Sequence, residues 1–164
     1  MNRLWITVDK VGINLGRREG LAQRKTVFMA TAGYSGTPLL KKLGLKEGQR
    51  VKLLHPPDDY FTWLAADISG QLCTRGECPD WVHLFAASRA VFEQGMRSLA
   101  PVWKKNPQVV IWASWYKKSS GMATDLTEDM IRGFALENGL VDIKVCAVSE
   151  LWSGLKLVVP VKDR

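Results

Sequence analysis

The loop that follows the apolar run "VVIWASW" carries residue types that suit an anion. Lys117 and Lys118 are followed by Ser119, Ser120 and Gly121. Ammonium groups, hydroxyls and free backbone N–H groups bind phosphate or carboxylate groups, above all at the N-terminus of a helix. These five residues are therefore the candidate ligand-binding or anion-binding residues of the chain.

Acidic residues a few positions later leave a second interpretation of this loop open. Asp125 and Glu128 have the spacing of a capping box, and Asp129 adds a further acid to the first turn of the following helix. These acids would satisfy the free N–H groups at that helix start and would repel a second negative group. The loop is then a structural joint between a strand and a helix rather than an anion site.

A candidate acid–base pair follows the earlier stretch "QRVKLLHPP". His55 precedes two prolines and the acids Asp58 and Asp59, at the carboxyl end of an expected strand, where open α/β sheets place ligands. His55 and Asp58 are therefore the candidate catalytic residues. The alternative is a Pro-Pro turn with solvated acids. His83, inside the apolar run 81–87, is predicted to be a core or edge histidine satisfied by one hydrogen bond.

The patterns for a cofactor or a metal are missing. Cys73 and Cys78 lie in "CTRGEC", but neither His55 nor His83 has ligand-like spacing to them, so we expect no metal site. Three free thiols in a reducing compartment are the expected state, with a reversible Cys73–Cys78 disulfide as an open alternative. Two prolines stand where a dinucleotide fold has a glycine-rich turn, and neither a P-loop nor a nucleophile elbow occurs. We expect no bound cofactor.

The net charge of +7 raises the question of a nucleic-acid partner. Residues 1–28 hold six basic and two acidic residues, so this extension carries +4 and leaves only +3 for the rest. The extension lacks a helical or strand period, and we expect a disordered arm or a gene-start artefact. The remainder, 29–164, is predicted to be a single domain in the cytoplasm with no membrane segment.

Strand and helix signals alternate along this domain. They predict a small three-layer Rossmann-like (methyltransferase-like) α/β fold, with a mainly parallel sheet and an antiparallel C-terminal strand pair. Trp112 and Trp115, three apart in one strand, are expected on opposite faces. One is expected in the core and the other packed under the crossover helices, with the lining of a groove or interface, where bases could stack, as the alternative. Three helices are expected: one with Thr37 as cap, Pro38 first and Gly44 after it; one from Ser88 to about Leu99, before Pro101; and one from Asp125 to before Gly139. Strands are expected within 49–57 and 81–87, in 108–115, and over 142–148 and 155–161. Residues 60–72 are ambiguous between strand and helix.

Four stretches in the same order resemble a bacterial family of uncharacterised proteins, a domain of unknown function. They are "GYSGTPLLKKLGL", "WASWYKKSSGMATDLTED", "GLVDIKVCAV" and "WSGLKLV", which together span about 33–160. Tyr116 stands where the family pattern has a proline, and the basic extension lies outside the pattern. The resemblance implies a natural start near Met29 and implies no particular activity.

Three functions remain open on these grounds. The leading hypothesis is a non-enzymatic module that binds a small anionic ligand or a protein partner at the carboxyl edge, through 55–60 and 116–121. A diverged methyltransferase-like enzyme is the alternative. Nucleic-acid binding through the basic extension comes third, because the body of the chain is only mildly basic.

Overall fold

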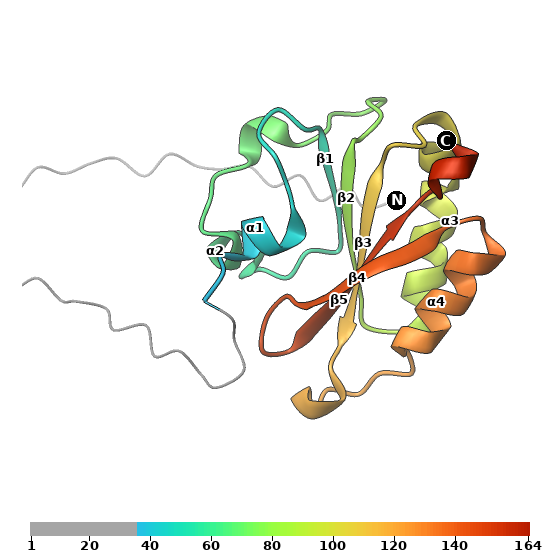
Figure 1. Cartoon of the computed structure of the whole chain (residues 1–164). Helices are drawn as coiled ribbons and strands as arrows, with labels where there is room; N and C mark the ends of the chain where they lie inside the picture. Colours follow the sequence, from blue (N-terminus) through green and yellow to red (C-terminus); the bar gives the residue numbers. More distant parts are fainter. Residues whose placement is uncertain (1–35) are drawn as a thin grey trace, which may run out of the picture. The chain divides into compact units, whose positions relative to one another are not determined.

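The computed structural model describes residues 36–164, which fold around one five-stranded sheet (Figure 1). The predictions for the extension 1–28 and for a start at Met29 lie outside the described residues. The order across the sheet is β1-β2-β3-β5-β4. In chain order the strands are β1 (Val51–Leu54), β2 (Trp81–Ala86), β3 (Val110–Tyr116), β4 (Val141–Ala147) and β5 (Trp152–Val158).

The direction of the strands confirms the predicted α/β class. β1, β2 and β3 pair in parallel, and β5 pairs antiparallel with both β3 and β4. Four strands therefore share one direction, and the C-terminal pair is antiparallel as predicted. The insertion of β5 between β3 and β4 is a feature that the sequence pattern did not indicate.

Helices cover both faces of the sheet, which completes the predicted three-layer Rossmann-like arrangement (Figure 1). α1 (Leu39–Leu43) and α2 (Tyr60–Leu64) pack on one face, and α3 (Arg89–Lys105) and α4 (Glu128–Glu137) on the other. Each face has its own apolar core, because strand side chains alternate between the two faces. In the described part of the chain, no helix has the length and apolarity needed to cross a membrane.

Trp112 and Trp115 lie on opposite faces of β3, as predicted. Trp112 belongs to the core under α1 and α2, and Trp115 to the core under α3 and α4. Both are buried, so the predicted packing under crossover helices is confirmed and the alternative of a groove-lining tryptophan is wrong. The Trp112 Nε1–H donates to the carbonyl oxygen of Leu43 at 2.9 Å and so ties β3 to the end of α1.

The helix α1 begins one residue later than predicted. Pro38, not Thr37, is the residue that precedes its first turn, and no side chain caps it. Gly44 ends the helix with a φ of 67°, the left-handed conformation that glycine adopts without strain. Residues 60–72, which the sequence left ambiguous, form α2 and a 3-10 turn at Ser69–Gln71.

The helix α3 continues through Pro101 to Lys105, although the sequence predicts an end near Leu99. Ser88 caps it as predicted, since its Oγ accepts the Val91 N–H at 3.4 Å. A proline inside a helix removes one backbone hydrogen bond. Burial of Trp103, two residues further on, stabilises the last turn and offsets that loss.

The helix α4 is capped by Thr127, so the prediction of Asp125 as its cap is wrong. The Thr127 Oγ1 accepts the Met130 N–H at 3.4 Å. Asp125 instead accepts the N–H of Arg89, the first residue of α3, at 2.8 Å. The carboxylate thus satisfies a free donor of a different helix, a contact that only the packing of the two elements creates. Gly139 follows the helix in the left-handed region, as predicted.

The last strand begins at Trp152, three residues earlier than predicted. The segment "SELWSG" was expected to connect the two strands, but Ser153 and Gly154 already pair with β4. The turn is shorter because the N–H groups of Val148 and Ser149 both donate to the Trp152 carbonyl oxygen.

Candidate functional site

The predicted anion loop leaves the carboxyl end of β3 but does not lead directly into a helix. Lys118–Ser120 form a 3-10 turn, and Gly121 is left-handed with a φ of 70°. An irregular stretch, 122–127, separates this turn from the first residue of α4. The helix α4 begins at Glu128 with Thr127 as its cap, so residues 117–121 do not directly precede its free N–H groups as predicted.

Lys117 hydrogen-bonds to the turn that joins β4 and β5. Its Nζ donates to the Ser149 carbonyl oxygen at 2.6 Å, and its backbone N–H donates to the Leu151 carbonyl oxygen at 2.9 Å. The Lys117 carbonyl oxygen accepts the Ser120 hydroxyl at 2.6 Å. Lys117 and Ser120 thus have partners inside the protein.

The other members of the predicted set face solvent. Lys118, Ser119 and Gly121 are exposed. Among residues 36–164, the side chains of Lys118 and Ser119 have no hydrogen-bond partner. Their role as ligands stays a prediction.

Replacing Lys117 by alanine is expected to cost about 1–2 kcal/mol of unfolding free energy, because the Ser149 carbonyl oxygen loses a charged donor. Lys118→Ala should stay within about 0.5 kcal/mol of the original protein. Urea unfolding of both variants measures the difference. Equal stabilities of the two variants would contradict a structural role for Lys117.

The predicted acid–base pair follows β1, whereas the loop follows β3. His55 and Asp58 are both exposed, and neither side chain makes a hydrogen bond within the described residues. His55 adopts a φ of 54°, which is uncommon for a residue with a side chain. β2 separates β1 from β3, so the two halves of the predicted pocket do not leave neighbouring strands. Their catalytic role stays a prediction.

Two cavities in the structure lie away from these predicted residues. One, of about 230 Å³, lies between α3 and α4 and is lined by Phe92, Phe134 and charged residues such as Arg89. The other, of about 570 Å³, is a wide depression beside α2, lined by Phe61 and Leu72 among others. Within residues 36–164, no group of three or more His, Cys, Asp or Glu side chains is placed to hold a metal ion.

A buried hydrogen-bonded chain links α2, β2 and β3, and the sequence analysis missed it. The Tyr60 hydroxyl lies 2.8 Å from His83 Nδ1, and the Ser114 Oγ lies 2.7 Å from His83 Nε2. All three side chains are essentially inaccessible to solvent. The prediction of a core histidine was right, but His83 has two hydrogen bonds rather than one.

This chain of Tyr60, His83 and Ser114 is built as part of the core. A neutral imidazole donates one hydrogen bond and accepts another, so both ring nitrogens are satisfied. Burial lowers the pKa of His83 to about 3, and it raises the pKa of the Tyr60 phenol. Phe85 stacks on the imidazole with ring centroids 4.2 Å apart. The groups resemble a catalytic set in type, but substrate has no access to them.

Lysines from α1, β4 and β5 and from the segment after α1 gather on the α1 side of the sheet. Lys144 on β4 and Lys156 on β5 are directly opposite each other in the ladder. Lys46, just after α1, lies close enough that it and Lys144 both lower the pKa of the Lys156 ammonium, in addition to the larger effect of burial. We call Lys42, Lys46, Lys144 and Lys156 the lysine surface.

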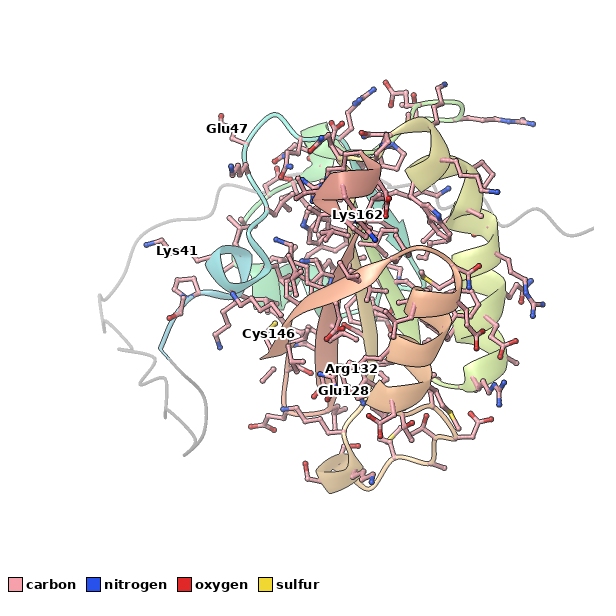
Figure 2. All side chains as sticks on the ribbon, turned by 45° about the vertical axis from the view of Figure 1, so that its right-hand side comes forward. Lys41, Glu47, Glu128, Arg132, Cys146 and Lys162 are labelled. Carbon is pink, nitrogen blue, oxygen red and sulfur yellow. The ribbon has the colours of Figure 1, made fainter. Side chains whose placement is uncertain are left out.

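The helix α1 is joined to this surface through β4. The Lys144 Nζ donates to the Lys42 carbonyl oxygen at 2.8 Å. Burial raises the pKa of the Cys146 thiol. The positive charges of Lys144 and Lys42 oppose this effect by a smaller amount. Figure 2 shows Cys146 on β4, and Lys41 extending outward from α1.

Several charged side chains of α3 and α4, on the opposite face of the sheet, form ion pairs. Arg132 of α4 forms an ion pair with Glu128, one turn earlier in the same helix (Figure 2), and another with Asp142 of β4. Within residues 36–164, none of the ion pairs involves Lys46, Lys144 or Lys156. The sequence has one lysine in each of the last two strands, and the pairing of those strands brings the two together.

Comparison with known proteins adds little to this geometry. No family model matches the chain, and no curated protein matches it. A protein of the NADB-Rossmann superfamily from Streptococcus agalactiae is 9% identical with a TM-score of 0.41, and the alignment covers 77% of this chain and 69% of that one. The B. subtilis m1A22 tRNA methyltransferase TrmK is also 9% identical, with a TM-score of 0.43 and coverage of 77% and 67%. Neither likeness bears on a cofactor or substrate of this chain.

Proposed function

We propose that this chain is a non-enzymatic binding module and that the lysine surface recognises an anionic partner. The observation that carries the proposal is the direct opposition of Lys144 and Lys156 in the ladder, with Lys46 beside them. Like charges at opposite positions of two strands destabilise a sheet. A bound anion relieves this repulsion, so the same arrangement that costs stability in the free protein favours binding.

The form of the surface favours a partner with several negative groups. The lysines come from three separate segments, namely the region of α1, β4 and β5. The two cavities described above lie elsewhere, so the surface is not a deep pocket for a single small ion. Lysine ammonium groups act as point charges without a fixed planar geometry, which suits phosphate or carboxylate groups at variable spacing. Phosphate-rich and carboxylate-rich partners therefore share the chemistry that this surface can recognise.

Lys156→Met is expected to weaken anion binding and at the same time to raise stability. Loss of one charge should reduce the affinity for tripolyphosphate at least fivefold in calorimetry at low salt. The free variant should gain a few tenths to about 1 kcal/mol of unfolding free energy, because the opposed charge and its desolvation are removed.

Lys118→Met is the matched control, because Lys118 is exposed and belongs to the loop predicted from the sequence. We expect its affinity for tripolyphosphate to be unchanged. Loss of affinity in Lys118→Met but not in Lys156→Met would place the anion at the loop and overturn the proposal. Equal small losses in both variants would show attraction by net charge alone. A parallel titration with an acidic glutamate peptide distinguishes a carboxylate-rich partner from a phosphate-rich one.

A further inference from the structure

We infer that Cys73 and Cys78 form a dithiol site that closes to an intramolecular disulfide by exchange with a low-molecular-weight disulfide. This site is separate from the lysine surface and does not depend on the proposed function. The sequence left the pair open as free thiols or a disulfide, and the structure adds a reason to join them.

A closed turn places the two cysteines at its ends. The Glu77 N–H donates to the Thr74 carbonyl oxygen at 3.3 Å, and the Thr74 N–H donates to the Glu77 Oε2 at 2.6 Å. Gly76 supports the reversal with a φ of 93°. Cys73 and Cys78 are the residues immediately before and after this turn. The hydrogen-bonded turn holds the Cα atoms of Thr74 and Glu77 within about 7 Å of each other. Cys73 and Cys78 are the outer neighbours of these two residues, and a disulfide between them requires a Cα separation of about 4–7 Å.

Arg50 lies near both thiols. Its guanidinium pairs with Asp80 at 2.9 Å, which is the main reason that its pKa is raised. Cys78 and Cys73 both contribute to the same shift, so both lie within electrostatic reach of this one side chain. Each cysteine is partly exposed, which leaves it open to a small reagent. The Cys73 backbone is fixed as well, since its N–H donates to the Val51 carbonyl oxygen at 2.8 Å.

The reaction is a balanced thiol–disulfide exchange. One protein thiolate attacks a sulfur of the low-molecular-weight disulfide, a mixed disulfide forms, and one small thiol leaves. The second protein thiolate then attacks the protein sulfur of the mixed disulfide and releases the second small thiol. The protein loses two hydrogens and the reagent is reduced to two thiols. Burial, with a smaller contribution from Glu77, raises the pKa of Cys73, so the exchange should run faster as the pH rises.

The test uses the full chain with oxidised glutathione as the probe. A thiol titration should find one free cysteine after oxidation, where the reduced chain has three. The mass should decrease by two hydrogens, and the protein should remain monomeric on a non-reducing gel. Peptide mapping should find Cys73 joined to Cys78 and Cys146 unpaired. Dithiothreitol should reverse the change, and the oxidised protein should melt a few degrees higher, because the link restricts the unfolded chain.

Single variants make the assignment falsifiable. Cys73→Ser and Cys78→Ser should each retain glutathione on the remaining partner and form no internal disulfide, whereas Cys146→Ser should behave like the original chain. Peptide mapping of the unmutated chain gives the same answer if a variant does not fold. Stable glutathione adducts on both Cys73 and Cys78 of the original chain, or a disulfide-linked dimer through either, would overturn the inference.

Discussion

Acidification from pH 6.5 to 4.5 is expected to lower the free energy of unfolding by about 2–3 kcal/mol through one side chain, His83. Burial lowers the pKa of His83 to about 3 in the folded protein, while an unfolded chain binds a proton near the ordinary value of about 6.5. Below that value the unfolded state binds more protons than the folded state, so stability falls with falling pH. The contribution of His83 is complete above the unfolded pKa and is lost as the pH decreases.

The window from pH 6.5 to 4.5 separates His83 from the carboxylates. Hydrogen bonds and ion pairs lower the pKa of Asp67, Glu77, Asp80 and Glu93, so these groups also lose stabilisation in acid. Their loss begins only near the ordinary carboxylate range of about 4. The slope above pH 4.5 therefore belongs mainly to the buried imidazole.

Urea unfolding at several pH values in this window measures the effect. His83→Gln should be less stable at pH 7, because it leaves gaps among the rings and an imperfect link between Tyr60 and Ser114, but its stability should vary much less between pH 6.5 and 4.5. His55→Gln is the matched control, since His55 is exposed, and it should retain the original dependence. The same steep decline in His83→Gln would disprove the assignment. If that variant does not fold, imidazole nitrogen shifts of the original chain should still show a neutral His83 at pH 5.

Trp112→Ala is expected to cost about 3–5 kcal/mol, the largest effect of any single truncation proposed for this chain. Its indole is completely buried under α1 and α2, so truncation leaves a cavity in that core. The change also removes the donor that holds the Leu43 carbonyl oxygen. We expect α1 to lose its anchor to β3 before the rest of the sheet unfolds.

Two further variants separate the cavity from the hydrogen bond. Trp112→Phe keeps most of the buried area and should cost about 1–3 kcal/mol, mainly because the Leu43 carbonyl oxygen loses its partner. Trp63→Ala is the control for removal of a partly buried tryptophan on the same face, and its cost should be smaller. Hydrogen exchange of the α1 amides should rise in both Trp112 variants and not in Trp63→Ala. Equal costs for Trp112→Ala and Trp63→Ala would contradict this account.

The sequence alone determined the class of the fold, because local patterns reflect local physics. Continuous apolar runs predicted β2 and β3, and Gly44 and Gly139 marked helix ends through their left-handed backbone. The odd spacing of Trp112 and Trp115 placed them on opposite faces. Each of these features depends on a residue and its near neighbours, so it can be read before any tertiary contact is known.

The tertiary structure decided where the functional groups meet, because those contacts join residues far apart in the chain. Asp125 accepts an N–H of α3 rather than one of its own helix. Lys117 donates to a hairpin more than thirty positions away in the chain, because packing brings these partners together. The link from Tyr60 through His83 to Ser114 requires three elements in register. The lysine surface exists because the register of the β4–β5 pair sets Lys156 opposite Lys144 and because α1 packs beside β4. Sequence patterns report which face a side chain occupies, but strand order determines which charges share that face.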